Sequence, residues 1–126
     1  MSGIRSYRQS SVVTADRMEL IVMLYDGFLS FTQSAVEAVE SGARARAGEA
    51  TSQALAIVHE LVASLDQNAE EGLVSSLSTL YEFVEHSLQE GNRHQDTAHY
   101  QNAAKVMSEL REGWGEASRM LRQKAA

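Results

Sequence analysis

The sequence predicts an all-α fold, an antiparallel up-down four-helix bundle with a mobile N-terminal arm. Three observations predict it: the 126 residues contain no proline, four long segments carry apolar residues at helical spacing, and short polar breaks separate them. Proline would remove a helix hydrogen bond and clash with the preceding turn, so its absence favours long helices. Short connections favour antiparallel neighbours. A chain of this length forms one domain, which we divide into an arm, residues 1–13, and a bundle, residues 14–123.

The first bundle helix is expected to begin with Thr14 as its N-cap and with Asp16 near its positive end. It should run to about Val39, where Gly42 can supply a left-handed cap. Residues 18–31 of this helix are more apolar than one core-facing stripe requires. The second apolar stripe fits either the bundle core or a groove for another chain or for the arm, and the spacing leaves these two readings nearly balanced.

Three further helices are expected, over residues 46–66, 70–90 and 97–123. Their apolar faces are, in order, Leu55, Val58, Leu61, Val62 and Leu65; Leu73, Leu77, Leu80, Tyr81, Val84 and Leu88; and Ala103, Met107, Leu110, Trp114, Ala117 and Leu121. Asp66 or Asn68 can cap the second of these helices, and Gly91 and Asn92 can end it. Asp96 is the expected N-cap of the last helix.

The composition excludes several classes of function. A chain without cysteine forms no disulfide, thiolate nucleophile or cysteine-based zinc site. The net charge of −6 argues against a nucleic-acid partner, because binding to phosphates needs a basic face. No segment approaches the roughly 20 apolar residues that span a bilayer, and the N-terminus has no apolar signal core. We therefore expect a cytoplasmic protein that does not insert into membranes.

Catalytic motifs are not found either. None of the four histidines follows a glutamate by three residues, the spacing that a di-iron carboxylate bundle needs. His59 and His86 are the candidates for a histidine phosphotransfer bundle, but neither has the neighbouring lysine that would neutralise a phosphoryl group. Adjacent carboxylates such as Glu70 and Glu71 fit solvated helix charges. We predict no enzyme, no cofactor and no metal, which leaves a partner-binding bundle, with a phosphotransfer module or a self-associating structural protein as alternatives.

Short motifs in a fixed order then suggest a family. The N-terminal stretch "GIRSYRQSSVVTADRMELIVMLYDG" supplies the matching positions Ile4, Tyr7, Val12, Thr14, Ala15, Glu19, Leu20, Leu24, Tyr25, Asp26 and Gly27. Later matches are "SLD" at 64–66, "LY" at 80–81, "LQEGN" ending at Asn92 and "LREGW" ending at Trp114. In this order and spacing the chain resembles the flagellin export chaperone family, FliS. It departs from the family where Asp16-Arg17 replaces Ser-Pro and where Glu70-Glu71 replaces Gly-Gly.

The resemblance implies a chaperone that binds the C-terminal segment of flagellin, which is disordered when alone and partly helical when bound. Binding would block premature filament assembly and present flagellin to the export gate of the flagellar type III apparatus. We expect flagellin contacts at Ile21, Leu24, Tyr25, Phe28, Leu61, Leu65, Tyr81 and Val84. For the arm, the resemblance implies that Ile4 and Tyr7 cover part of the groove or dock on the export gate. A homodimer stays open.

Overall fold

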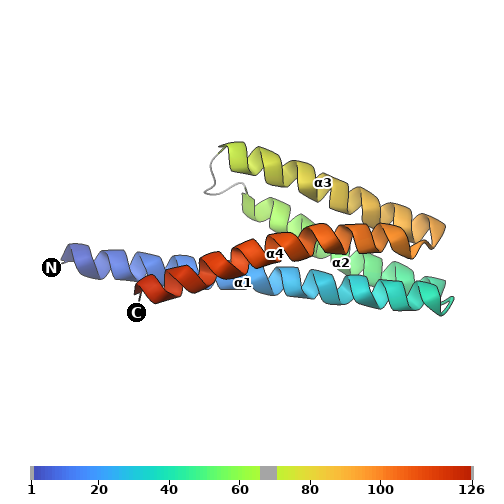
Figure 1. The fold of residues 1–126 in the computed structure, drawn as a ribbon, viewed down its shortest axis with the longest axis horizontal. Helices are drawn as coiled ribbons and strands as arrows, with labels where there is room; N and C mark the ends of the chain where they lie inside the picture. The colour runs from blue at the N-terminus through green and yellow to red at the C-terminus, as the bar shows by residue number, and fades with distance from the viewer. Residues whose placement is uncertain (1, 66–70, 126) are drawn as a thin grey trace.

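The part of the chain that the structure describes folds into four long α-helices. The computed structural model describes residues 2–65 and 71–125, with side chains for residues 16–65 and 71–124. Within these ranges it contains no strand, and its helices are α1 (Ser2–Glu40), α2 (Arg44–Leu65), α3 (Glu71–His94) and α4 (Thr97–Ala125) (Figure 1). The predicted all-α class is confirmed.

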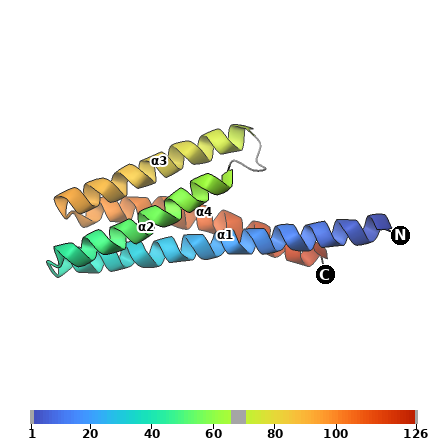
Figure 2. The same ribbon diagram turned by 180° about the vertical axis from the view of Figure 1, so that it is seen from behind.

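Consecutive helices run in opposite directions, so the two termini lie at the same end of the bundle (Figure 1). α1 packs against α2 and α4, and α3 packs against the same two helices. The diagonally opposite helices, α1 with α3 and α2 with α4, do not pack their backbones against each other in the described part of the chain. At the end that holds the termini, α1 and α4 extend beyond α2 and α3 (Figures 1 and 2). The predicted up-down four-helix bundle is confirmed.

The beginning of α1 differs from the prediction. We expected the first helix to begin with Thr14 as its N-cap, after the arm, but α1 begins at Ser2 and passes through this position without a break. Nothing in the backbone chemistry forbids this, because no proline occurs there. Asp16 therefore lies inside the helix, and its carboxylate accepts a hydrogen bond from Arg122 of α4 at 2.5 Å instead of stabilising a helix end.

The turn between α1 and α2 follows the prediction. Gly42 has a φ of 73°, in the left-handed region that glycine enters without a steric penalty. The N–H of Ala43 donates to the carbonyl of Ala38 at 2.8 Å, and the N–H of Gly42 donates to Val39 at 3.0 Å. This pair of bonds is a Schellman motif, which satisfies the last carbonyls of α1 and reverses the chain.

The turn between α3 and α4 uses a different residue from the one expected. Gly91 and Asn92 do not end α3 but lie inside it, and the left-handed position is Gln95, with a φ of 50°. The N–H of Asp96 donates to the carbonyl of Gly91 at 3.0 Å, and the Gln95 amide donates to the carbonyl of Asn92 at 2.7 Å. Asp96 is the N-cap of α4, as predicted, and accepts a 3.0 Å bond from a first-turn N–H.

All four helices contribute to one core. Its buried members are Tyr25, Phe28, Ala35, Val36, Ala50, Ala54, Val58, Leu61, Leu65, Leu77, Tyr81, Val84, Leu88, Tyr100, Ala103 and Met107. Thr32 is also buried, and its hydroxyl has no hydrogen-bond partner among the described residues. Most of the predicted apolar faces enter this core, but Val62 and Leu73 do not, because they lie exposed at the adjacent ends of α2 and α3.

Candidate partner-binding surface

The eight predicted flagellin contacts fall into two groups in the structure. Six of them are buried between the helices: Tyr25, Phe28, Leu61, Leu65, Tyr81 and Val84. In the structure these six side chains are covered by neighbouring helices and form part of the bundle core, and their contact with flagellin stays a prediction. Ile21 and Leu24 are half-buried and pack against the edge of this core, which leaves part of each side chain at the surface. The side chains of Ile4 and Tyr7, expected to act in the arm, lie outside the described residues.

Exposed apolar side chains gather at one end of the bundle. Six large apolar residues are exposed in the described part of the chain. Val62 and Leu73 lie near the connected ends of α2 and α3, Met120 lies near the end of α4, and Leu20 and Met23 follow Glu19 of α1, which bonds Arg122 of α4. We call these five the apolar end: Leu20, Met23, Val62, Leu73 and Met120. Leu20 and Met23 are 61% and 63% exposed, so neither is needed to fill the core. Clustered exposed apolar surface marks interaction sites more often than isolated residues do.

Several half-buried apolar side chains lie on the helices that carry the apolar end. Besides Ile21 and Leu24, these are Val74 on α3 and Leu110 and Trp114 on α4, and each packs against the core. These five side chains are thus only partly covered by the bundle. α1 is two-sided, with Tyr25 and Phe28 in the core and Leu20 and Met23 in solvent.

A hydrogen-bonded chain of three aromatic side chains joins α1, α3 and α4. The hydroxyls of Tyr25 on α1 and Tyr81 on α3 are 2.5 Å apart, and the indole N–H of Trp114 on α4 donates to the Tyr25 hydroxyl at 3.1 Å. Burial raises the pKa of Tyr25 and of Tyr81 above the ordinary value of about 10, so both stay neutral at physiological pH. Both hydroxyls have a hydrogen-bond partner, as buried polar groups require.

A second buried hydroxyl pair lies toward the opposite end. The hydroxyls of Thr51 on α2 and Tyr100 on α4 are 2.7 Å apart, and the Thr51 hydroxyl also donates to the carbonyl of Ala47 at 2.6 Å. The Tyr100 ring lies directly against Gly91 of α3, where a Cβ atom would come within 2.8 Å of the ring. Glycine at this position is thus explained by close packing, not by a helix end.

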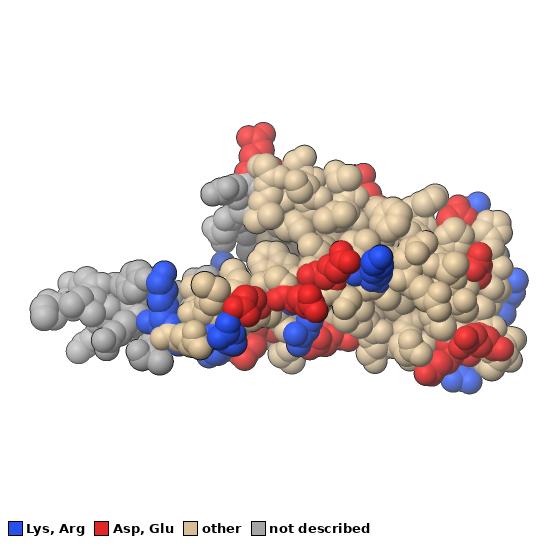
Figure 3. Space-filling model, viewed as in Figure 1, with Lys and Arg blue, Asp and Glu red and all other residues tan. Residues whose placement is uncertain are grey.

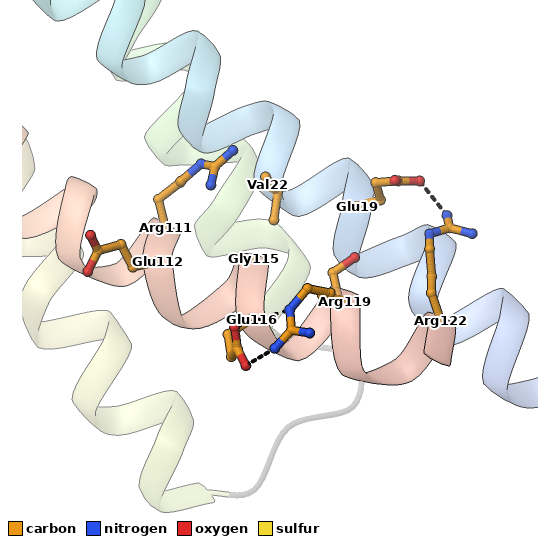
Figure 4. Close-up of a pocket in the computed structure, with 9 residues that line it drawn as sticks. Glu19, Val22, Arg111, Glu112, Gly115, Glu116, Arg119 and Arg122 are labelled. Carbon is orange, nitrogen blue, oxygen red and sulfur yellow. Dashed lines mark hydrogen bonds and ion pairs between the residues drawn. The ribbon is translucent and has the colours of Figure 1, made fainter. Parts of the chain in front are cut away.

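The face between α1 and α4 is ionic. Arg111 donates to Asp26 through Nε at 2.9 Å and Nη2 at 3.4 Å, and Arg122 bonds both Asp16 and Glu19. Figure 4 shows a hollow on this face, lined by Glu19, Val22, Arg111, Glu112, Gly115, Glu116, Ser118, Arg119 and Arg122. Figure 3 shows charged side chains gathered along α4 and α1, whereas the surface over α3 in that view is mostly uncharged. Because carboxylates accompany each of these arginines, the hollow does not present free positive charge to an anion.

The histidines lie beside carboxylates on the surface. His59 is 3.4 Å from Glu85, and His86 is 3.8 Å from Glu90, which also lies 3.0 Å from His94. A neighbouring negative charge opposes phosphorylation of a histidine. Among the residues with described positions, no group of three metal-ligating side chains is found. No helix in this part of the chain is long and apolar enough to cross a membrane.

Comparison with known proteins identifies the family. The sequence model of the family described as flagellar protein FliS matches residues 1–121 of this chain. The flagellar secretion chaperone FliS of Salmonella typhimurium is 33% identical, over 93% of this chain and 90% of the relative, and the Bacillus subtilis chaperone is 32% identical, over 89% and 83%. The chain belongs to the FliS family. The flagellar secretion chaperone FliS of Escherichia coli is 27% identical, over 91% of this chain. FliS is a family of flagellar secretion chaperones, not a family of enzymes.

The structure shows why the FliS-like motifs recur far apart in the sequence. "LYDG" on α1 meets "LREGW" on α4 twice, through Tyr25 with Trp114 and through Asp26 with Arg111. Gly27, the last residue of "LYDG", lies against α2, where a Cβ atom would come within 3.0 Å of Ile57. Tyr25, Asp26, Gly27, Arg111 and Trp114 therefore make contacts between helices.

Sequence reasoning missed part of the exposed surface. Met23 and Met120 were not singled out, and Val62 and Leu73 were assigned to the core. For Val62, Leu73 and Met120 the available signal was their position near helix ends, where a four-helix core has fewer neighbours to offer, whereas Met23 lies in the middle of α1. Tyr100 was also missed as a core residue, although it continues the spacing of Ala103 and Met107 backward by three residues.

Proposed function

We propose that this FliS protein is a cytoplasmic export chaperone that binds the disordered C-terminal segment of flagellin. It prevents premature polymerisation and delivers flagellin to the flagellar type III export apparatus. The observation that carries the proposal is the apolar end, in a chain of a secretion chaperone family. A monomeric bundle gains nothing from exposing Leu20 and Met23, whereas a partner segment can cover them.

The chemistry of this surface suits a disordered client. An apolar segment that becomes helical can place side chains at helical spacing against the apolar end. The ordering entropy that the client loses on binding offsets part of the contact energy, so the complex stays reversible. A delivery chaperone requires such reversibility, because the client must leave at the export apparatus. Ile21 and Leu24 remain our proposed flagellin contacts at the edge of the core, and the six buried residues, whose contact stays a prediction, shape the bundle.

The proposal is tested by calorimetry with a peptide of the C-terminal segment of flagellin from the same organism. We expect micromolar or tighter binding by the wild type. Replacing Leu20 and Met23 together by serine should weaken binding by about tenfold or more, because two apolar contacts are lost. Phe83→Ser is the matched control, since Phe83 is equally apolar and 45% exposed but lies outside the apolar end. Absence of binding by the wild type would refute the proposed function.

The N-terminal segment supplies a second test. We propose that Ile4 and Tyr7 contact the export gate or cover the client groove, as the family resemblance implies. Tyr7→Ala should then leave the urea midpoint unchanged while altering client or gate binding. Unfolding of the bundle by this substitution would show instead that Tyr7 is structural.

Self-association is the competing use of the same surface. Light scattering with and without the flagellin peptide separates the two uses. A chaperone should change its mass to that of a complex with the client, whereas a structural oligomer should keep its mass and bind no peptide.

A further inference from the structure

Three residues from distant parts of the sequence meet in one hydrogen-bonded cluster. They are Tyr25 of "LYDG", Tyr81 of "LY" and Trp114 of "LREGW", each from a separate motif and a separate helix. Trp114 differs from the other two, because Tyr25 and Tyr81 are almost fully buried whereas Trp114 is half-buried. The cluster thus connects the interior of the bundle to its surface.

The geometry fixes the direction of this connection. An indole N–H can only donate, so the Tyr25 oxygen accepts a hydrogen bond from Trp114. The same hydroxyl makes a second hydrogen bond with the hydroxyl of Tyr81. Neither tyrosine can turn freely, because each ring is packed in the core. The orientation of the Trp114 ring is therefore set from inside the bundle, through Tyr25.

We propose that Trp114 is a client-contact residue beside the apolar end, and that Tyr25 and Tyr81 position its ring. The inference rests on the proposed function and names a contact that sequence reasoning assigned to the tyrosines themselves. Leu110, one turn before Trp114 and half-buried like it, lies on the same face of α4. Tryptophan is enriched among the residues that dominate binding energy, and a ring held in place before binding loses less entropy when the partner arrives.

The spectroscopic test uses Trp114 as its own reporter, because it is the only tryptophan in the chain. A tryptophan-free peptide of the flagellin C-terminal segment is titrated into the wild-type protein. We expect the emission of Trp114 to shift to shorter wavelength at saturation and its quenching by acrylamide to fall at least twofold. Binding in calorimetry with no change in either signal would overturn the inference while leaving the proposed function standing.

The positioning role is tested by removing one hydroxyl at a time. Tyr25→Phe keeps the ring but deletes the acceptor for Trp114, so acrylamide quenching of the free protein should increase and client affinity should fall about fivefold. Tyr81→Phe should have a smaller effect in the same direction, because it acts through Tyr25. Tyr100→Phe is the matched control, since it removes a buried hydroxyl bonded to Thr51 and distant from Trp114.

The expected pattern is loss of stability in all three variants, with loss of affinity confined to Tyr25→Phe and Tyr81→Phe. Equal loss of affinity in Tyr100→Phe would show that the hydroxyls act only through bundle stability, and would overturn the positioning role. Unchanged affinity in Tyr25→Phe would overturn it as well. Absence of peptide binding by the wild type would refute the proposed function itself, which separates that failure from the others.

Discussion

Replacing Gly91 by alanine tests the packing of α3 against α4. The new Cβ atom would lie 2.8 Å from Cε2 and 2.9 Å from Cδ2 of the Tyr100 ring. To restore ordinary carbon–carbon contact, the ring would have to retreat by roughly half an ångström or more. It cannot do so easily, because Tyr100 is fully buried and its hydroxyl is bonded to Thr51.

The expected magnitude combines two opposing effects. Overpacking of a core costs about 1–3 kcal/mol, whereas alanine is favoured over glycine inside a helix by about 1 kcal/mol. We expect the overlap at Gly91 to outweigh helix propensity, for a net loss of up to about 2 kcal/mol in the free energy of unfolding. Gly113→Ala is the control with the opposite sign, because a Cβ atom there meets nothing within 4 Å. It should stabilise the protein by up to about 1 kcal/mol.

Urea unfolding followed by circular dichroism measures both effects. The midpoint should fall for Gly91→Ala and rise for Gly113→Ala, at an unchanged slope. If Gly91→Ala were as stable as the wild type, the ring would have room to move and our account of this glycine would be wrong. If both variants lost stability, the effect could not be assigned to the contact with Tyr100.

Three further predictions concern stability. Asp96→Ala should cost about 1 kcal/mol in urea unfolding through loss of the N-cap bond of α4, and Asp96→Asn, which retains an acceptor, should cost less. Thr32→Val should be neutral or stabilising in the same assay, because it replaces a buried hydroxyl that has no described partner by a methyl group. Since burial raises the pKa of Tyr25 and Tyr81, stability should be constant with respect to these groups below pH 10 and fall as the pH rises above it, where only the unfolded state ionises readily. Urea midpoints at pH 8.5 and 10.5 should therefore differ less in the double variant Tyr25→Phe, Tyr81→Phe, and an equal difference would contradict this assignment.

The helices could be predicted from the sequence because helical spacing and turn residues are local properties. Gly42 and Asp96 were placed correctly, since a left-handed cap and an N-cap depend on a few adjacent residues. The prediction that Gly91 ends a helix was wrong, because the sequence alone does not distinguish a glycine that ends a helix from one that makes room for an aromatic ring. Only the position of Tyr100, nine residues later, separates the two.

The candidate surface was harder to predict for a related reason. An α1 that is apolar on two sides can present either side to the core, and local spacing does not say which neighbours it will have. Tyr25 and Phe28 faced inward, whereas Leu20 and Met23 faced solvent. The family resemblance indicated a binding protein but could not assign these faces, because motif positions serve helix contacts as well as partner contacts.

The two buried hydroxyl pairs also bear on how the helices are aligned along the bundle axis. Each pair joins diagonally opposite helices, Tyr25 with Tyr81 across α1 and α3, and Thr51 with Tyr100 across α2 and α4. Leucine, valine and alanine faces tolerate a slip of one helical turn, about 5.4 Å, because one apolar side chain can replace another. A hydroxyl pair does not tolerate it, since the slip would leave buried polar groups without partners. The two hydroxyl pairs thus help to specify the register of the four helices, as a buried asparagine does in a coiled coil.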